Sequence, residues 1–418
     1  MTRPTTEPAT CAGPAVRDNT GVRRTLGAAY GRLWVAAVTS RFGDAVRTPA
    51  LALLAVSLTR DPRLVAAVVA AGQVPPLLFG LLAGVYADRW DRRRTMAMVD
   101  GIRCVLVAAL AVLVLFGQVG IGALAAAAFL LAALGALFDA AAFAVLPALV
   151  PADRLPAANG RLAAGTAVAG GFVGAPVAGL LFAISTALPF AVDAVSFALA
   201  ALLALTLPPL TSPVVAPPRR SVWREAGDGL RWLRRDPTLF RITALTAASN
   251  LAISGLIAVM VLYALEVLRV PEAGYGLFMA CAVVGGLAGG LGAGRVAGRL
   301  GTRTGLRWVL AVQTIALVAL AVSRHPLPAA IALAVFSAGS AIWNALWSTY
   351  GQRHVPAELL GRVGSAQRVA GLLAAPVGAL LAGFTANAYG LLPVAYAAAA
   401  IFAVVTGTAR RVLHSRPE

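Results

Sequence analysis

Three charged residues interrupt the first long apolar stretch of the chain: Arg41, Asp44 and Arg47. At a spacing of three they share one face of a helix, so either arginine can pair with the aspartate. Asp44 lies about 16 Å along that helix from Leu33, near the middle of an apolar layer about 30 Å thick. A carboxylate at that depth is costly when charged and can take up and release a proton. The triplet therefore predicts a proton-coupling site, with a permanent Arg–Asp brace as the alternative.

Further charged side chains fall inside later apolar stretches. Asp100 and Arg103 are three residues apart and are expected to pair with each other. Asp139 is expected either to line a central cavity or to accept an arginine from the charged segment around Asp88, and Asp193 to be a helix-packing partner. The uncharged polar residues predicted to line a cavity are Gln73 and Asn250.

The composition requires these side chains to sit in membrane helices. The 418 residues are 59% hydrophobic and 12% charged, with a mean hydropathy of +0.82. Twelve windows offer the roughly 20 apolar residues that a helix needs to cross a bilayer, from Leu33–Leu58 to Leu391–Thr408. The sequence therefore predicts an all-α integral membrane protein with twelve transmembrane helices.

The net charge of +18 reflects topology and does not indicate a nucleic-acid partner. All 35 basic residues are arginines. Twenty-eight of them fall on one side of the predicted topology and four on the other. By the positive-inside rule the arginine-rich side is cytoplasmic. We therefore expect a multi-pass protein of the cell membrane with both termini in the cytoplasm.

The chain divides at its longest polar interruption, and its two halves share short patterns. Val-Pro-Ala-Asp/Glu precedes a span in each half, and a Gly-x4-Pro spacing recurs 200 residues apart. The charged segment after the second span has a copy without aspartates near Gly298. These repeats predict two pseudo-symmetric six-helix bundles. The expected organisation is a disordered cytoplasmic tail (1–24), an N-terminal bundle (25–207), a cytoplasmic linker with an interfacial helix (208–237), a C-terminal bundle (238–409) and a second tail (410–418).

Short motifs along the chain resemble those of one transporter family. The segment Gly-Val-Tyr-Ala-Asp-Arg-Trp-Asp-Arg-Arg-Arg from Gly84 to Arg94 resembles the loop between helices 2 and 3 of the major facilitator superfamily. The motifs at 40–44, 146–151, 193–197, 229–237 and 275–277 together resemble its exporter branch that contains enterobactin exporters and macrolide-efflux proteins.

The resemblance implies two further sites. In such transporters the charged loop latches the two halves on the cytoplasmic side, where its aspartate faces the N-terminus of a helix near Val363. The latch residues here are Gly84, Asp88, Arg89, Asp91, Arg92 and Arg93; the alternative is that they are ordinary surface charges. The second site is an imperfect match to the Gly-Pro motif of proton-driven exporters, formed by Gly171, Pro176 and Gly179. Pro376 repeats the feature in the second half. The alternative is that these residues form an ordinary tight helix interface.

These patterns predict a secondary transporter and no enzyme. The sequence holds no Gly-x4-Gly-Lys-Ser/Thr phosphate-binding loop, so the proton motive force is the expected energy source, with no cofactor and no metal. The predicted function is efflux of a small amphipathic molecule, such as a drug, antibiotic or siderophore-like natural product, in exchange for protons, by a monomer embedded in the lipid bilayer. The alternatives to this function are an importer or facilitator on the same fold, and a membrane scaffold or sensor that does not transport.

Overall fold

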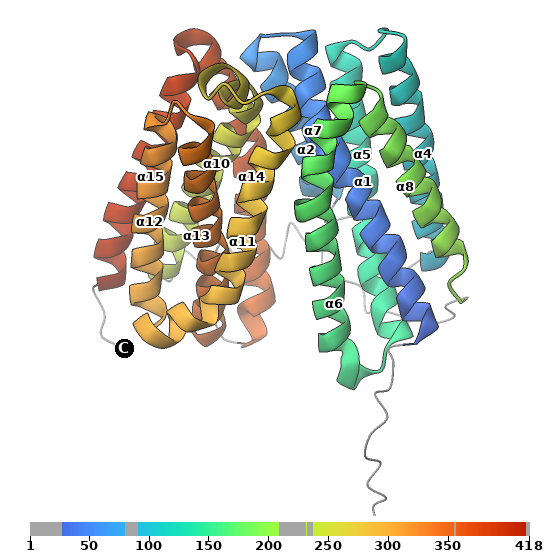
Figure 1. Ribbon diagram of the computed structural model, residues 1–418. Helices are drawn as coiled ribbons and strands as arrows, with labels where there is room; N and C mark the ends of the chain where they lie inside the picture. Colours follow the sequence, from blue (N-terminus) through green and yellow to red (C-terminus); the bar gives the residue numbers. More distant parts are fainter. Residues whose placement is uncertain (1–26, 80–90, 209–230, 232–236, 355–356, 415–418) are drawn as a thin grey trace, which may run out of the picture.

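Twelve helical spans build the protein, as the sequence predicts (Figure 1). The computed structural model describes residues 27–79, 91–208, 231, 237–354 and 357–414. In the first half the helices are α1 (Ala28–Leu58), α2 (Pro62–Phe79), α4 (Arg92–Leu115), α5 (Ile121–Leu149), α6 (Leu155–Ala167) continuing through a π-helical stretch (Val168–Gly174) into α7 (Ala175–Ile184), and α8 (Leu188–Leu205). In the second half they are α10 (Pro237–Leu262) with a π-helical end (Tyr263–Val267), α11 (Glu272–Leu300), α12 (Thr302–Val322), α13 (Pro326–His354), α14 (Ala357–Tyr389) and α15 (Leu391–His414).

Most of these helices are long and apolar enough to cross a bilayer by themselves. Among the described residues ten spans satisfy both conditions by length and composition. The other two are α1, which carries four charged side chains, and the shorter apolar helix Pro62–Leu78 within α2. Several sequence-predicted parts lie outside the described residues: the tail at 1–24, most of the linker at 208–237 with its interfacial helix, and the loop residues Gly84, Asp88 and Arg89.

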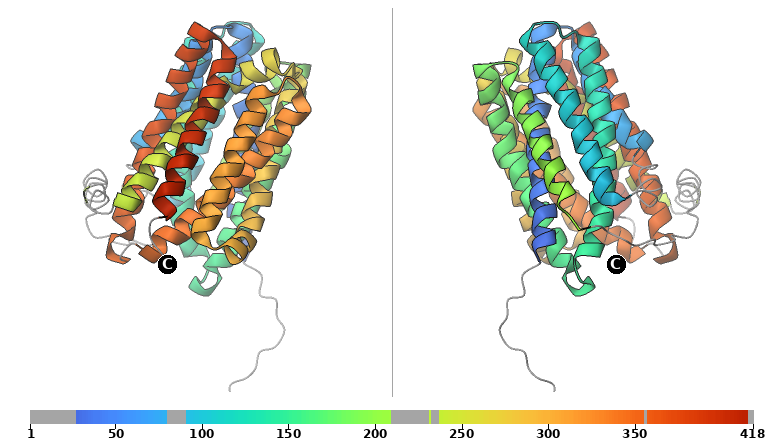
Figure 2. Two further views of the ribbon diagram at one scale, coloured as in Figure 1. Left: turned by 90° about the vertical axis from the view of Figure 1, so that its left-hand side faces the viewer. Right: turned by 90° about the vertical axis from the view of Figure 1, so that its right-hand side faces the viewer.

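The two halves stand side by side, and the described chain ends lie at the same end of the bundle (Figures 1 and 2). Within the first half α8 packs against both α1 and α4; within the second, α13 packs against α11 and α12. The bulk of the apolar core is continuous between the halves at the end opposite the chain termini, where Leu54 and Phe182 belong to the same cluster as Met260 and Tyr263.

Two helix pairs form the seam between the halves: α2 with α14, and α7 with α11. Small residues allow close approach there. The α-carbon of Gly179 lies against the backbone of Ala273, and Gly383 lies against Pro62 and Ala66. The seam is tight at the end away from the termini, where α7 ends and α11 begins, so the halves are closed to each other on that side.

Candidate functional site

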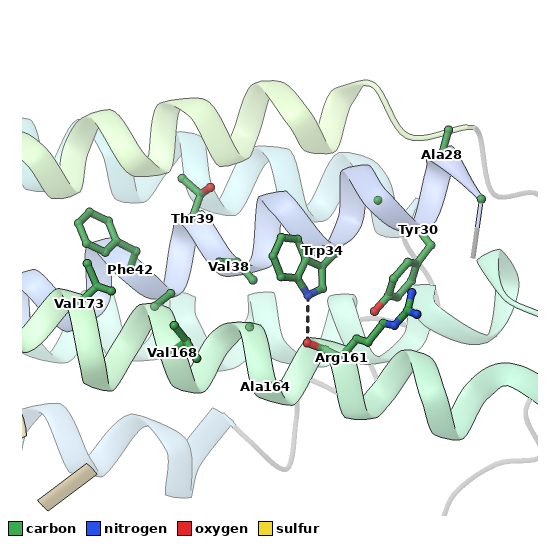
Figure 3. A pocket seen from close by; sticks show the side chains of 14 residues that line it. Ala28, Tyr30, Trp34, Val38, Thr39, Phe42, Arg161, Ala164, Val168 and Val173 are labelled. Atoms are coloured by element: carbon green, nitrogen blue, oxygen red, sulfur yellow. Dashed lines mark hydrogen bonds between the residues drawn. The ribbon is translucent and has the colours of Figure 1, made fainter. Parts of the chain in front are cut away.

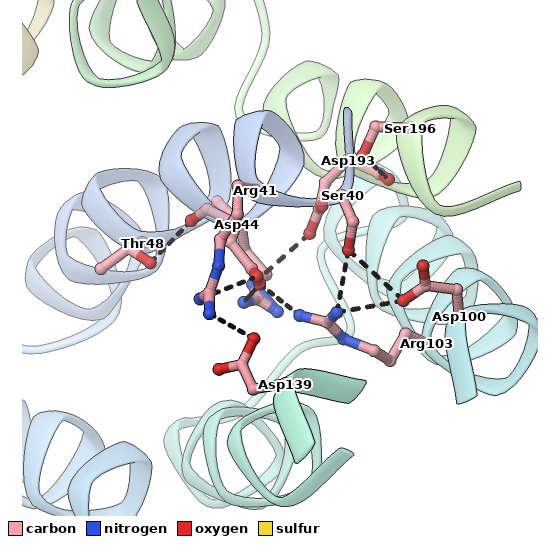
Figure 4. A network of polar contacts seen from close by, with 10 residues as sticks. Ser40, Arg41, Asp44, Thr48, Asp100, Arg103, Asp139, Asp193 and Ser196 are labelled. Carbon is pink, nitrogen blue, oxygen red and sulfur yellow. Dashed lines mark hydrogen bonds and ion pairs between the residues drawn. The ribbon is translucent and has the colours of Figure 1, made fainter. Parts of the chain in front are cut away.

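A cluster of charged side chains occupies the interior of the first half (Figure 4). Four aspartates and three arginines converge there from four helices: Arg41, Asp44 and Arg47 from α1, Asp100 and Arg103 from α4, Asp139 from α5, and Asp193 from α8. We refer to these seven residues as the charge cluster.

Asp44 lies at the centre of the charge cluster. Its Oδ1 atom accepts hydrogen bonds from Arg47 on its own helix and from Arg103 on α4. Arg41 is a more distant partner, with 3.9 Å between Nη1 and the other carboxylate oxygen. The Asp44 side chain keeps 18% of its surface exposed. The predicted proton-coupling triplet is therefore an assembled ion-pair group, and one of the two arginines that donate hydrogen bonds to Asp44 comes from a different helix.

Arg103 joins the α4 side of the cluster to α1. Its Nη1 atom donates to Asp100 Oδ1 at 3.1 Å, which is the pair that their spacing predicts, and to Ser40 Oγ at 3.2 Å. The guanidinium also lies 3.9 Å from the centre of the Phe197 ring, a cation–π contact that stabilises a desolvated cation. Arg103 is thus held by two carboxylates and one aromatic face.

Asp139 connects the charge cluster to a cavity. It accepts a hydrogen bond from Arg41, and both side chains are substantially exposed, at 51% and 42%. They line a cavity of about 260 Å³ together with residues of α1, α5 and α6, among them Leu146 and Thr166. Asp139 thus lines this cavity and receives its arginine from α1, and its expected place in a central transport cavity stays a prediction.

Asp193 completes the cluster from α8. Its side chain is fully buried, and its Oδ2 atom lies 3.4 Å from Arg47 Nε. A β-carbon at Gly43 would collide with Asp193 Oδ1 and Ser196 Oγ, so a glycine is required where α1 passes α8. Sequence reasoning identified Asp193 only as a packing residue and did not identify Ser40 or Gly43. The signal that could have found Ser40 and Gly43 is that two small residues, three positions apart, stand just before Asp44 on the same helix.

A larger and mostly apolar groove lies on another face of α1 (Figure 3). Its volume is about 1040 Å³, and residues of α1, α6 and the π-helical stretch that follows α6 line it, including Val38, Phe42 and Val168. Val38 and Phe42 are turned about 60° and 100° around the helix from Arg41, so the groove is separate from the cavity at Asp139. Trp34 Nε1 donates to the Arg161 backbone carbonyl at 3.0 Å and so links α1 to α6 along the groove (Figure 3). The α1–α6 pair thus forms a wall between two hollows.

The second half offers a different chemistry. A small hollow there is lined by neutral polar side chains, including Asn250, Gln313 and Ser340, and Gln313 Nε2 donates to Ser340 Oγ at 2.8 Å. Among the described residues, every fully buried charged side chain belongs to the first half. On α2, Gln73 is partly buried and its Oε1 atom has no hydrogen-bond partner.

The glycines of the Gly-Pro segment lie against other helices. A β-carbon at Gly171 would collide with Val283 of α11, and one at Gly179 with the Ala273 backbone. Pro176 lies in the first turn of α7, just after the π-helical stretch, and Pro376 lies in the interior of helix α14. This geometry is that of a tight interface between the two halves.

The described part of the predicted latch has roles within the first half. Asp91 caps the N-terminus of α4, where its Oδ1 accepts the Arg93 backbone N–H at 3.1 Å. The Arg93 Nη1 atom donates to the Leu207 carbonyl at 2.9 Å, just beyond α8. Arg92 begins α4.

Two six-helix halves that meet at a seam, with ionisable groups at a cavity wall, define the class of secondary transporters. A profile of the Major Facilitator Superfamily matches residues 33–379, and the chain belongs to this superfamily. None of the curated proteins compared with this sequence matches it.

Solved structures share the fold at low sequence identity. The nucleoside transporter NupG is 15% identical with a TM-score of 0.75, covering 93% of this chain and 100% of that chain. An inward-facing bacterial homologue of the iron transporter ferroportin is 17% identical, with a TM-score of 0.75 and coverages of 93% and 99%. The outward-facing form of that homologue gives a TM-score of 0.57, at 18% identity and coverages of 93% and 100%. The TM-score is thus higher with the inward-facing form of this homologue than with its outward-facing form.

Proposed function

We propose that this protein exports a small amphipathic molecule in exchange for protons. The observation that carries the proposal is the charge cluster, which is buried in one half and reaches a cavity through Arg41 and Asp139. Ionisable groups inside a bilayer are costly, and they mark ion pathways and proton relays. Protonation of a carboxylate in such a cluster changes which ion pairs hold the helices together, and so links proton binding to movement of the halves.

The amphipathic character of the cargo follows from the cavity walls. Around Asp139 the lining combines apolar side chains such as Phe138 and Leu146 with the polar groups of Asn159 and Thr166. Pockets of this kind bind ligands through apolar area, and a few polar groups fix the orientation. The neutral polar hollow at Asn250 would supply the opposing wall in the second half.

The latch and the topology remain part of this proposal. With the arginine-rich side in the cytoplasm, both termini are cytoplasmic and the tight seam lies on the outer side. The loop at Gly84, Asp88 and Arg89 would then close the cytoplasmic side in the opposite state. Resemblance to the enterobactin and macrolide exporter branch favours export over import, with the protein acting as a monomer.

Transport by the purified protein in proteoliposomes tests the proposal. A panel of amphipathic cations and neutral macrolides is offered under an imposed pH gradient, with nucleosides as a comparison set. We expect at least one amphipathic compound to accumulate against its gradient, and Asp44→Asn to abolish the dependence on pH while leaving exchange intact. Accumulation without dependence on the pH gradient would indicate a facilitator, and no movement of any compound would favour the scaffold or sensor alternative.

A further inference from the structure

The charge cluster contains one more acid than base. Arg41, Arg47 and Arg103 face four carboxylates, on α1, α4, α5 and α8. With every group ionised, the cluster would carry an uncompensated negative charge inside a bilayer-spanning bundle. An unpaired charge in that environment is strongly unfavourable, and the group neutralises by binding a proton. One carboxyl group of the cluster is therefore expected to be protonated.

Three of the four carboxylates accept at least one hydrogen bond from an arginine. Asp44 accepts hydrogen bonds from two arginines, and Asp139 accepts one from Arg41 while half exposed to solvent. Asp100 accepts hydrogen bonds at Oδ1 from Arg103 at 3.1 Å and from Ser40 at 3.4 Å, while its buried Oδ2 has no hydrogen-bond partner.

Asp193 is the poorly compensated member. It is fully buried, and neither of its carboxylate oxygens takes part in a hydrogen bond. Its ion-pair contact is Arg47 Nε at 3.4 Å. The other titratable groups that face it are Asp100, Arg103 and Cys104 of α4 and Asp44 of α1. The remaining helix packed on α8, α7, has no charged residue.

Arg47 stands between the two acids that compete for it. Its Nη2 atom donates to Asp44, while its Nε and Nη1 atoms are buried without a hydrogen-bond partner. Those unused donors are available to Asp193, which reaches α1 because Gly43 has no side chain. A small rotation of the guanidinium could therefore exchange one carboxylate for the other.

We propose that Asp193 holds the transported proton in this state and that Arg47 transfers its pairing from Asp44 to Asp193 when the proton leaves. This inference rests on the proposed proton-coupled function and moves the proton store from Asp44, which keeps 18% of its side chain exposed, to the fully buried Asp193. Protonation forms one O–H bond on the Asp193 carboxyl with a proton taken from water, and release returns that proton to water. The step needs no other reactant, and the charge of the cluster is balanced whenever one acid is protonated.

Infrared spectroscopy of the purified full chain at neutral pH tests the inference without any substrate. The C=O stretch of a protonated carboxyl group reports the stored proton directly. We expect this band in the wild-type protein, its loss in Asp193→Asn, and a doubled intensity in Arg47→Gln, because that variant leaves a second acid uncompensated. Asp193→Glu should restore a band at a shifted frequency. As a matched control, Asp61→Asn, outside the cluster, should leave the band unchanged.

The outcomes separate this inference from the proposed function. A band that persists in Asp193→Asn but disappears in Asp44→Asn overturns the assignment to Asp193. Absence of the band in the wild type overturns the inference that the cluster stores a proton. If the band changes in the variants as expected but transport does not depend on the pH gradient, Asp193 is still the proton-binding site and the proposed coupling of transport to protons is wrong. Chromatographic monodispersity of each variant confirms that loss of the band is not loss of the fold.

Discussion

Gly179 of α7 lies directly against the Ala273 backbone of α11, leaving no room for a side chain between them. On the opposite side of the seam Gly383 of α14 approaches Pro62 and Ala66 of α2 in the same way. These contacts hold the halves together at the end away from the termini. Alternating access requires the same contacts to separate and re-form in each cycle.

Gly179→Val should therefore shift the protein toward the state that is open at this end. The β-carbon would collide with the Ala273 carbonyl, so the closed seam becomes unfavourable while the first half itself remains intact. The readout is thiol labelling of Ala70→Cys, a buried α2 position in the cluster that joins the halves, in a variant without other cysteines. Labelling by a membrane-impermeant maleimide should accelerate at least several-fold. Gly286→Val on α11, where a β-carbon meets nothing within 4 Å, is the matched control.

Arg41→Gln or Asp139→Asn should impair transport with little loss of stability. This ion pair is largely exposed, and exposed pairs contribute about 1 kcal/mol or less to the free energy of unfolding. Loss of the pair nevertheless changes the charge of the cavity wall. Thermal unfolding in detergent and transport in proteoliposomes are measured in parallel. Asp153→Asn, which removes the exposed 3.8 Å pair with Arg154, controls for charge alone. A fall in stability comparable to that of a core variant contradicts this prediction.

Arg103→Leu should destabilise the first half strongly. Removing the guanidinium leaves Asp44 and Asp100 facing each other with less compensation, and breaking a buried pair in this way costs about 3–5 kcal/mol. The midpoint of thermal unfolding should fall sharply, and the double variant Arg103→Leu/Asp100→Asn should recover part of the loss. If the double variant is no more stable than the single one, the two side chains are not energetically coupled.

The turn before α2 should make stability depend on pH in the acid range. Hydrogen bonds from Arg63 hold the pKa of the Asp61 carboxyl below its usual value. The stabilisation is complete above the ordinary aspartate pKa and is lost as the pH falls through the lowered value. The difference in unfolding midpoint between the wild type and Asp61→Asn should therefore be constant near neutral pH and vanish as the pH falls below the ordinary aspartate pKa of about 4 and through the lowered pKa of Asp61. A difference that persists at the lowest pH would show that the charged carboxylate is not its source.

The spans were predictable because each needs only a local run of apolar residues, and twelve such runs are visible in the sequence. The predicted ends of the spans were less accurate. The first helix begins at Ala28 and not at Leu33, since Tyr30 is buried and its hydroxyl donates to the Ala158 carbonyl, a contact 128 residues away.

The membership of the charge cluster was only partly predictable. The spacing of Asp100 and Arg103 identifies their pairing because it lies within one helix. No such rule joins Arg47 to Asp193, since their meeting depends on how α1 and α8 are placed at Gly43. The same limit applies to Asp139, for which the sequence left two roles open and tertiary packing supplied Arg41.

The charges of α1 also bear on how the protein enters the membrane during synthesis. A charged residue near the centre of a helix disfavours insertion by about 2.5–3.5 kcal/mol, and α1 carries three such residues at Arg41, Asp44 and Arg47. It is not among the spans that are apolar enough by themselves. Its neutralising partners, Arg103 and Asp193, are made later, with α4 and α8. Because α1 precedes both partner helices in the chain, we expect it to settle stably in lipid only after α8 has been synthesised.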